Sequence, residues 1–548
     1  MNALAHGAAE AVHAAHPLDA AGPPQFTGSA DITQLAGSAV QSVDWLAISP
    51  PTIAAVAGLA VLVADLFLPE RGKRLLGPAA AVSLLLAALP LLFLRSRNLE
   101  TFCLPDGSRA CAYSADTLSL VLQFLVLGAA FVTALLSMPA VRDLRLPAGE
   151  YWFLLLSATA GAALVPASRD LVTLVIALET ASLPAFALVG LRRGSRGSAE
   201  AALKFFLSSV TATAVTLLGA SFLYAVTGTL YFRGISEGLS RADPQLEALG
   251  SAGIALTLVG FAFKAAVVPF HFWVPDTYVG APVPVAAFLS VVGKTAGISG
   301  LILLLVQAFS SRAELWGTAL AVLAAVTMTA GNAAALRQSA DRAHGAVRLL
   351  AWSSVGQAGY LLVPLAAAAP DVGGEEPSGT ALSTVGATVA YLLMYAAVNL
   401  GAFAVVAHIS RTSRANRLAD YRGLYAAHPV AALALAFFLL CLAGLPPGVI
   451  GLFAKLAIFS TAIGNGLGWL AVIMAVNVVI ALFYYLRWTA LAFRAPTADA
   501  AVTQAGEGHQ RTRMAPPLAA GIALTAAAGV ALSLDPDLVL TFTAGGLR

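Results

Sequence analysis

The chain has 548 residues, of which 59% are hydrophobic and 11% are charged, and its mean hydropathy is +0.83. Soluble domains carry about 25% charged residues, so this composition excludes a soluble globular protein. A membrane-spanning helix needs about 20 mostly apolar residues, and the chain contains fourteen such runs. They cover residues 50–68, 74–94, 114–137, 149–166, 170–191, 199–226, 249–276, 283–307, 314–337, 345–367, 380–408, 429–462, 466–492 and 515–534. We therefore expect an all-α polytopic membrane protein with about 14 transmembrane helices.

The segment before the first span, residues 1–43, is rich in Ala and His and contains no Lys or Arg. It lacks the basic region and the apolar core of a signal peptide. We therefore expect a flexible external tail.

The 31 Lys and Arg residues are distributed unevenly along the chain. Five lie well inside spans, 18 lie in connections after odd-numbered spans or at the span ends that border them, and 8 lie in connections after even-numbered spans or in the tails. Cytoplasmic connections carry the excess of Lys and Arg in membrane proteins. We therefore expect the odd-numbered connections in the cytoplasm and both termini on the external side.

Three cysteines are too few for a Cys-ligated iron–sulfur cluster or zinc site, and no metal site is expected. Cys103 and Cys111 share one external connection, where the oxidising environment permits a disulfide. Two free thiols are the expected state, with the disulfide as the alternative. Cys441 lies in an apolar run and is expected to fill the core.

Two spans are unusually long and contain prolines. The seventh span contains Pro269 and Pro275, and the twelfth contains Pro446 and Pro447. Proline removes a backbone donor and clashes with the preceding turn, so each span should form two half-helices joined by an irregular segment. At membrane depth such a segment must be buried in protein or line a wet cavity.

The two broken spans lie five helices apart, and an odd offset reverses the direction of the chain through the membrane. We therefore expect helices 4–8 and 9–13 to form two inverted five-helix repeats, as in many transporters. The expected units are the external tail (1–43), helices 1–3 (44–147), the first repeat (148–308), the second repeat (312–492), and a cytoplasmic loop with the final helix (493–548).

Five ionisable residues lie within apolar spans: Glu179, Lys204, Lys264, Lys294 and Lys455. A charged side chain at the bilayer centre costs about 2.5–3.5 kcal/mol on insertion scales, and such residues mark ion and proton pathways. A lysine ammonium can release its proton when its surroundings change, whereas an arginine guanidinium effectively cannot. The five residues therefore indicate a pathway for protons or ions.

Other interpretations remain open for several polar residues. Glu179 can instead be a structural carboxylate, and Lys204 can extend its amine to the membrane interface. His271 follows the proline break and is compatible with a proton relay or with a packing role. Asp276 and Asp116 are expected to be capping or structural groups.

The sequence contains the stretches IALETASLPAFALVGLRR, AEAALKFFL, GFAFKAAVVPFHFWVPDTYVGAPVPVAAFLSVVGK, GNAAALRQ, LLAWSSVGQAGYLL and LAGLPPGVIGLFAKLAIF. These stretches resemble the antiporter-like membrane subunits of respiratory complex I, most of all the subunit N type, over residues 150–490. The resemblance implies a proton-translocating subunit of an NADH–quinone oxidoreductase in the plasma membrane of a bacterium. It places NADH, FMN, iron–sulfur clusters and quinone in partner subunits and no cofactor in this chain.

The resemblance also implies roles for the buried ionisable residues. Glu179 and Lys264 would belong to the coupling machinery, with Lys204 as the lysine that pairs with the glutamate. Lys294 would be a central relay, and Lys455 would be the route to the outer side.

The chain departs from the family pattern at Gln357, where relatives often carry His. Because glutamine does not titrate, a relay here would run through water. A polar stripe formed by Ser353, Ser354 and Gln357 in the tenth span can hold such waters.

Two other functions are considered. A subunit of a multisubunit Na+/H+ antiporter shares the fold and the Glu–Lys pair, but the stretches PFHFWVPDTYVGAP and LAGLPPGVIGLFAKLAIF favour the subunit N type. A stand-alone solute carrier is disfavoured, because a chain of lysines does not suit a neutral substrate.

Overall fold

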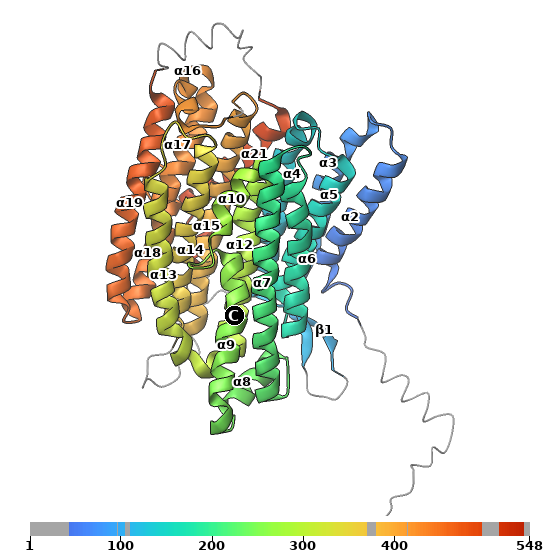
Figure 1. The fold of residues 1–548 in the computed structure, drawn as a ribbon, viewed down its shortest axis with the longest axis vertical. Coiled ribbons are helices and arrows are strands. Elements are labelled where there is room, and N and C mark those ends of the chain that lie inside the picture. The colour runs from blue at the N-terminus through green and yellow to red at the C-terminus, as the bar shows by residue number, and fades with distance from the viewer. Residues whose placement is uncertain are drawn as a thin grey trace, which may run out of the picture.

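A computed structural model describes residues 43–95, 97–104, 110–369, 380–413, 415–495 and 514–541. It is a bundle of helices that run side by side, with a small β-hairpin at one end (Figure 1). The α-helices are α2 (Ser49–Phe67), α3 (Leu76–Leu94), α4 (Thr117–Asp143), α5 (Ala148–Leu164), α6 (Leu171–Gly190), α7 (Arg196–Thr227), α8 (Phe232–Ser240), α9 (Glu247–Ala265), α10 (Trp273–Gly280), α11 (Val283–Phe288), α12 (Lys294–Leu303), α13 (Ala313–Leu336), α14 (Gly345–Ala367), α15 (Thr380–Ser410), α16 (Leu424–Ala427), α17 (Pro429–Ala443), α18 (Val449–Gly464), α19 (Gly468–Phe493), α21 (Pro516–Leu534) and α22 (Asp537–Leu540).

The remaining elements are short. The 3-10 helices are η1 (Gly72–Leu75), η2 (Val165–Ala167), η3 (Pro244–Leu246), η6 (Ser310–Arg312) and η7 (Leu418–Tyr421). Two π-helical segments are η4 (Leu289–Gly293) and η5 (Leu304–Ala308). The strands are β1 (Leu99–Cys103) and β2 (Cys111–Ala115).

The helical membrane architecture predicted from the sequence is confirmed. Thirteen helical stretches in the described residues are long and apolar enough to cross a membrane, and the shorter apolar helices α17 and α18 occupy the predicted twelfth span. The inverted relation between the two groups of five helices stays a prediction. The external tail lies outside the described residues, apart from its last position.

Burial separates the central helices from the peripheral ones. The most apolar windows of Val283–Ala308, Gly345–Ala367 and Thr384–Ser410 are 89%, 94% and 89% buried inside the protein, whereas those of α2 and α21 are each 28% buried. The central helices therefore offer the most room for charged side chains away from lipid. The outer helices α2, α3 and α21 expose leucine, valine and phenylalanine side chains instead.

The seventh and twelfth spans are broken, as predicted. In the seventh, α9 ends at Ala265 and α10 begins at Trp273, so Pro269 lies in the irregular segment. The expectation that Pro275 also interrupts this span is wrong, because Pro275 lies in the first turn of α10. There its missing N–H would have had no helical partner.

The break in the twelfth span lies between Ala443 and Val449 and contains both Pro446 and Pro447. Gly444 begins it with a φ of +85°, a left-handed conformation that glycine adopts without strain. The backbone at this point leaves the path of α17, and the Leu442 and Ala443 carbonyl groups receive no backbone N–H bond from the described residues that follow.

The hairpin on the predicted external side corrects the expectation for two cysteines. Cys103 and Cys111 lie directly opposite each other in the antiparallel pairing of β1 and β2, and a disulfide joins them. The expected pair of free thiols is therefore wrong, because register in the hairpin brings the two sulfur atoms together. Cys441 is a free, buried cysteine, as predicted.

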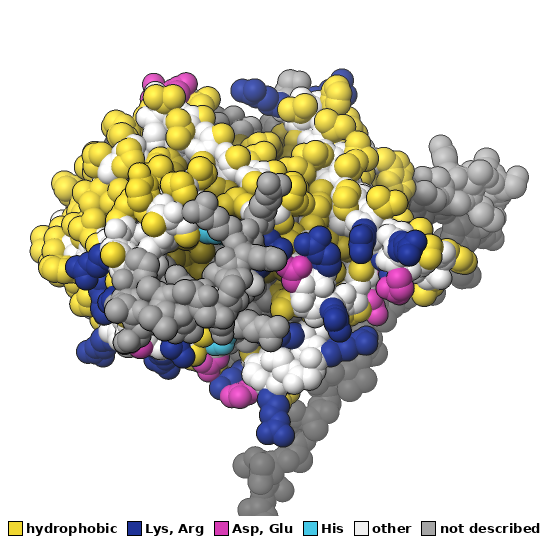
Figure 2. Space-filling view, turned by 90° about the horizontal axis from the view of Figure 1, so that it is seen from above, with side chains coloured by type: hydrophobic (Ala, Val, Ile, Leu, Met, Phe, Trp, Pro, Cys, Tyr) yellow, Lys and Arg dark blue, Asp and Glu magenta, His cyan; other side chains and the backbone are white. Residues whose placement is uncertain are grey.

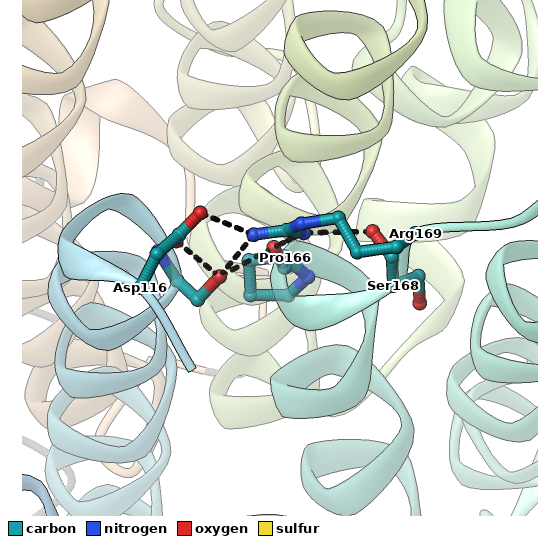
Figure 3. A network of polar contacts seen from close by, with 5 residues as sticks. Asp116, Pro166, Ser168 and Arg169 are labelled. Atoms are coloured by element: carbon teal, nitrogen blue, oxygen red, sulfur yellow. Dashed lines mark hydrogen bonds and ion pairs between the residues drawn. The ribbon is translucent and has the colours of Figure 1, made fainter. Parts of the chain in front are cut away.

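An ion-pair network fixes the same end of the bundle (Figure 3). Asp116 caps α4 by accepting a hydrogen bond from the Ser119 backbone N–H at 2.9 Å, which confirms its predicted structural role. The Arg169 guanidinium contacts the Asp116 carboxylate and donates to the Pro166 and Ser168 carbonyl oxygens at 3.1 and 2.7 Å. This network connects the start of α4 with the segment between α5 and α6.

The opposite end of the bundle carries the connections after odd-numbered spans, including the α2–α3 connection and α16 (Figure 1). Figure 2 shows this end, where Lys and Arg side chains gather beside a hydrophobic rim. The structure thus brings together basic residues that are far apart in the sequence, which suits a cytoplasmic face.

The predicted orientation can be tested with two exposed serines, Ser240 after the sixth span and Ser339 after the ninth. In Ser240→Cys, an impermeant thiol reagent should label intact cells from outside. In Ser339→Cys, labelling should require access to the cytoplasm. The native cysteines give little background, because Cys441 is buried and the other two are bonded. The reverse pattern would overturn the orientation.

Candidate functional site

The predicted site residues lie on the broken helices and their neighbours. Glu179 is half-buried on α6 and faces α7, where the Thr213 hydroxyl donates a hydrogen bond to its carboxylate at 2.6 Å. The carboxylate acts electrostatically on Lys264. The structure does not bring Lys204 and Glu179 into an ion pair, so their predicted partnership is not present in this arrangement.

Lys264 occupies the last turn of α9, immediately before the break. Its side chain is buried, and its Nζ lies 5.1 Å from the ring centre of Phe205, 5.2 Å from Phe186 and 5.9 Å from Phe263. A desolvated cation over aromatic faces at these distances gains about 2 kcal/mol. The rings therefore favour the ammonium form without supplying a fixed counter-charge.

Side chains from other elements satisfy backbone groups at this break. The Trp273 indole N–H donates to the Phe263 carbonyl oxygen at 3.0 Å, and the Thr327 hydroxyl accepts from the Val268 N–H at 3.1 Å. His271 also lies in the break, half-buried, with its ring 5.5 Å from that of Trp352. Its position is compatible with the predicted relay, which stays a prediction.

Lys204 belongs to a charged cluster on the predicted cytoplasmic side. Its ammonium pairs with Glu200 at 2.7 Å and with Asp276 at 3.1 Å, and Asp276 also pairs with Arg348 at 3.5 Å. A polar cavity of about 340 Å³ lies against this cluster and against His344. Asp276 thus connects α7, α10 and α14, which agrees with the structural role expected for it.

His344 lies outside the membrane spans, at the start of α14. Burial lowers the pKa of His344, and the nearby Arg192 and Arg348 lower it further. The imidazole is therefore neutral at pH 7, because its usual pKa is already about 6.5. Neutral His344 adds no positive charge to the cavity at physiological pH.

A water-sized void lies next to Lys264. Its volume is about 20 Å³, and its lining includes Lys264, Ser182 and Gly293, the residue before Lys294. A volume of roughly 10–15 Å³ suffices for one water molecule. Helix α12 comes close to the same point, because a Cβ added to Gly297 would lie 2.5 Å from the Ala265 nitrogen.

Lys294 begins α12, directly after the π-helical segment η4. It is 2% exposed, its ammonium donates to the Ser354 carbonyl oxygen, and its Nζ lies 5.3 Å from the centre of the Tyr395 ring. π-helical turns within α-helices are frequent at functional sites. The sequence predicted the lysine but contained no signal for the π turn.

A network of tyrosine hydroxyls surrounds Gln357, and sequence analysis missed it. The Ser353 and Tyr485 hydroxyls lie 2.5 Å apart, the Gln357 amide donates to Tyr485 at 3.3 Å, and the Tyr391 hydroxyl donates to the Gln357 carbonyl. The predicted polar stripe therefore contacts protein hydroxyls directly. Tyrosines inside apolar spans, which need hydrogen-bond partners when buried, were the available signal.

Lys455 lies on α18, facing the end of α17. Its ammonium donates to the Leu442 and Ala443 carbonyl oxygens at 2.9 and 2.7 Å, and its Nζ lies 5.7 Å from the centre of the Tyr360 ring. The C-terminus of a helix carries partial negative charge and unpaired carbonyl groups. The break in the twelfth span therefore creates a binding site for this cation.

Gly444 makes the approach of Lys455 possible. A Cβ at this position would lie 3.2 Å from the Lys455 Cδ and 3.4 Å from its Nζ. Substitution would therefore both strain the left-handed backbone and displace the lysine.

Comparison with known proteins identifies relatives over most of the chain. A family model described as "NADH:quinone oxidoreductase/Mrp antiporter, TM" matches residues 168–481. NADH-quinone oxidoreductase subunit N 2 of Streptomyces griseus is 63% identical over 518 residues, which cover 93% of this chain and 95% of the relative. NADH-quinone oxidoreductase subunit N of Salinispora tropica is 42% identical over 453 residues, covering 82% and 85%.

Solved structures share the architecture. A chain of respiratory complex I from Thermus thermophilus with bound aureothin is similar with a TM-score of 0.70 and 32% identity, covering 90% of this chain and 98% of that one. A chain of the Mrp complex from Dietzia sp. has a TM-score of 0.75 at 22% identity, covering 92% and 96%. The latter likeness concerns the fold alone.

Gly444→Ala should destabilise the protein by about 1–2 kcal/mol, the usual cost of a left-handed conformation for an L-residue. Gly464→Ala is the control, because nothing lies within 4 Å of a Cβ there and Gly464 ends α18, the helix that carries Lys455. Thermal unfolding of the purified protein measures the difference. Equal unfolding temperatures for the two variants would contradict the close contact.

Proposed function

Because this chain belongs to the NADH:quinone oxidoreductase and Mrp antiporter family of membrane subunits, we propose that its buried lysines carry protons across the membrane. It is the antiporter-like, proton-translocating membrane subunit of an NADH–quinone oxidoreductase, since relatives at 63% and 42% identity are of the subunit N type. The Mrp antiporter alternative has less support, because the likeness to that complex is at 22% identity.

The observation that carries the proposal is the placement of three buried lysines on the central part of the bundle. Lys264, Lys294 and Lys455 are 8%, 2% and 3% exposed. Lys264 lies beside a break, Lys294 follows a π turn, and the Lys455 ammonium reaches the end of α17 at the other break. A buried ammonium is costly unless the protein compensates its charge, so three such groups in one core are retained for function. Regular α-helix would offer no free carbonyl group to them.

Protons are taken up on the cytoplasmic side, through the cavity beside Lys204 and Asp276. This cavity is polar, and its charged groups can order water between the surface and the seventh span. His271, in the break between α9 and α10, lies on the chain between Asp276 and Lys264 and is the proposed relay to that lysine.

The step from Lys264 to Lys294 uses the water-sized void that is lined by Lys264 and by Gly293, the residue before Lys294. One water there can receive a proton from the Lys264 ammonium and deliver it toward α12. The step requires no movement of a helix, because Gly297 already brings α12 against the backbone of Lys264.

The step from Lys294 to Lys455 uses hydroxyl groups. The Tyr395 hydroxyl donates to Ser354 at 3.0 Å beside Lys294, and the Tyr391 and Tyr360 rings stack with centres 6.1 Å apart beside Lys455. Gln357 orients the hydroxyls between these points without titrating. The sequence predicted a relay at Gln357 that runs through water. We propose that tyrosine hydroxyls are also part of this relay.

Glu179 controls the charge of Lys264. A carboxylate favours the ammonium form of a nearby lysine, and loss or movement of the negative charge disfavours it. Thr213 holds the carboxylate at 2.6 Å. Rotation of Glu179 toward or away from this hydroxyl would change how strongly it acts on Lys264, and so would load or release a proton.

The chain acts within a larger assembly. We propose that NADH, FMN, the iron–sulfur clusters and quinone bind to the other membrane and peripheral subunits of the complex, and that this chain supplies proton movement. We also propose a bacterial plasma membrane as its location, with both termini on the external side.

Lys264→Met should assemble into the complex and reduce proton pumping at least tenfold, because it removes the titratable amine but keeps much of the volume. Lys264→Arg should pump as poorly, since a guanidinium is not deprotonated. Leu258→Met on the same helix is the control. Formation of membrane potential in vesicles with assembled complex is the measurement, and wild-type pumping in Lys264→Met would refute the role.

Glu179→Gln should slow both quinone reduction and pumping several-fold, because Lys264 loses its negative neighbour and its ammonium form becomes more costly. Glu179→Asp keeps the charge and should be milder. NADH–quinone turnover and membrane potential are measured on the same vesicles. Full activity of Glu179→Gln would reduce this residue to a structural role.

A further inference from the structure

A large cavity with a basic lining lies at the predicted cytoplasmic end of the bundle, outside the proton pathway. Its volume is about 840 Å³. It is bounded by the start of α3, the end of α4 and the start of α21, with α5 beside them. We call it the basic cavity, after the six cations in its lining: Lys73, Arg74, Arg142, Arg145, Arg193 and Arg411.

The cations outnumber the acids in this lining by six to one, since Glu70 is the single acidic residue in it. Three of the cations take part in ion pairs with neighbouring acids. These are Lys73 with Glu70 at 3.0 Å and Asp65 at 3.5 Å, and Arg142 and Arg411 with Asp143 at 3.3 and 2.7 Å. A surplus of positive charge therefore remains.

Arg74, Arg145 and Arg193 carry this surplus, because none of them forms an ion pair within the part of the chain that the structure describes. Arg411 adds an unsatisfied donor, since its Nη1 is buried without a hydrogen-bond partner among those residues. Guanidinium groups bind phosphate oxygens through two parallel N–H bonds. The cavity thus presents donors and charge that fit an anionic phosphate.

The rest of the lining is apolar. Met138, Pro139 and Trp152 form part of it, and Trp152 is 2% exposed. A cavity lined by both cations and apolar side chains matches the boundary between headgroups and acyl chains. A free nucleotide or phosphate would leave the apolar part of the lining without a matching apolar group. A neutral quinone would leave the six cations without a negative charge.

The helices and connections around the basic cavity favour a lipid headgroup as the phosphate that it would bind. Helices α3 and α21 both pack on α4 and expose leucines outward, so two of the helices that bound the cavity present an apolar surface suited to lipid. Its six cations all belong to connections after odd-numbered spans. These connections face the cytoplasmic leaflet, whose anionic lipids are attracted by such clusters.

We propose that the basic cavity binds an anionic phospholipid of the cytoplasmic leaflet. Arg74, Arg145 and Arg193 hold its phosphate together with Arg411, and its acyl chains lie against Met138 and Trp152. The lipid connects the first three spans and the final span with the loops of both predicted repeats. It thereby supports helices that share few direct contacts with the proton pathway.

The test uses the assembled complex, purified in detergent and depleted of lipid. Dioleoylphosphatidylglycerol, dioleoylphosphatidylcholine and inorganic phosphate are titrated separately, with native mass spectrometry and thermal unfolding as readouts. Phosphatidylglycerol should bind at least tenfold more tightly than phosphatidylcholine and should raise the unfolding temperature. Equal binding of the two lipids, or stabilisation by inorganic phosphate alone, would overturn the proposal.

Variants locate the binding. Arg74→Gln with Arg145→Gln should weaken binding of phosphatidylglycerol at least tenfold, and Arg74→Lys with Arg145→Lys should retain most of it. Arg337→Gln with Arg342→Gln, two exposed arginines on the same predicted side, is the matched control and should bind like wild type. Unchanged binding in the first pair would contradict the site.

A phosphatidylglycerol with a photoactivatable acyl chain keeps the test independent of variant assembly. On the wild-type complex it should label the end of α4 near Met138. Labelling confined to other helices, or exclusion of the lipid by a neighbouring polypeptide cross-linked in the cavity, would overturn the proposal.

Discussion

The structure depends on one constraint: a lysine ammonium in the core of a membrane protein must be solvated by the protein itself. The chain solves this in three ways. Aromatic faces surround Lys264, a carbonyl and one ring receive Lys294, and the free end of a half-helix receives Lys455. Each solution requires a departure from regular helix, so breaks, π turns and buried charges occur together. The surrounding helices serve to keep these departures away from lipid.

The spans, the breaks and the charged positions could be predicted from the sequence because each is a local property. About 20 apolar residues define a span, and a proline inside it removes a backbone donor wherever the chain folds. The limit of local reasoning is visible at Pro275. Whether a proline interrupts a helix depends on where the helix starts, and α10 starts two residues before it.

Contacts between distant spans could not be predicted. Lys204 and Asp276 are 72 residues apart, and Ser353 and Tyr485 are 132 residues apart, so their pairing depends on how the helices cross. Glycines set several of these crossings, since a Cβ at Gly297 would overlap the backbone at Ala265. The disulfide was missed for a similar reason, because the register of a hairpin decides whether Cys103 and Cys111 meet. The function could be inferred from the sequence, whereas the contacts between the site residues required the three-dimensional structure.

The carbonyl pair beside Lys455 gives the proposed proton exchange at this site a direction in space. An ammonium has three N–H donors, and a neutral amine retains two together with one lone pair. Two donors point to the Leu442 and Ala443 oxygens at 2.9 and 2.7 Å. Both carbonyls can therefore stay hydrogen-bonded in either protonation state, and the departing proton is the third one. The lone pair it would leave points away from the two carbonyl groups, so in the proposed pathway protons would reach and leave Lys455 from that side of the nitrogen.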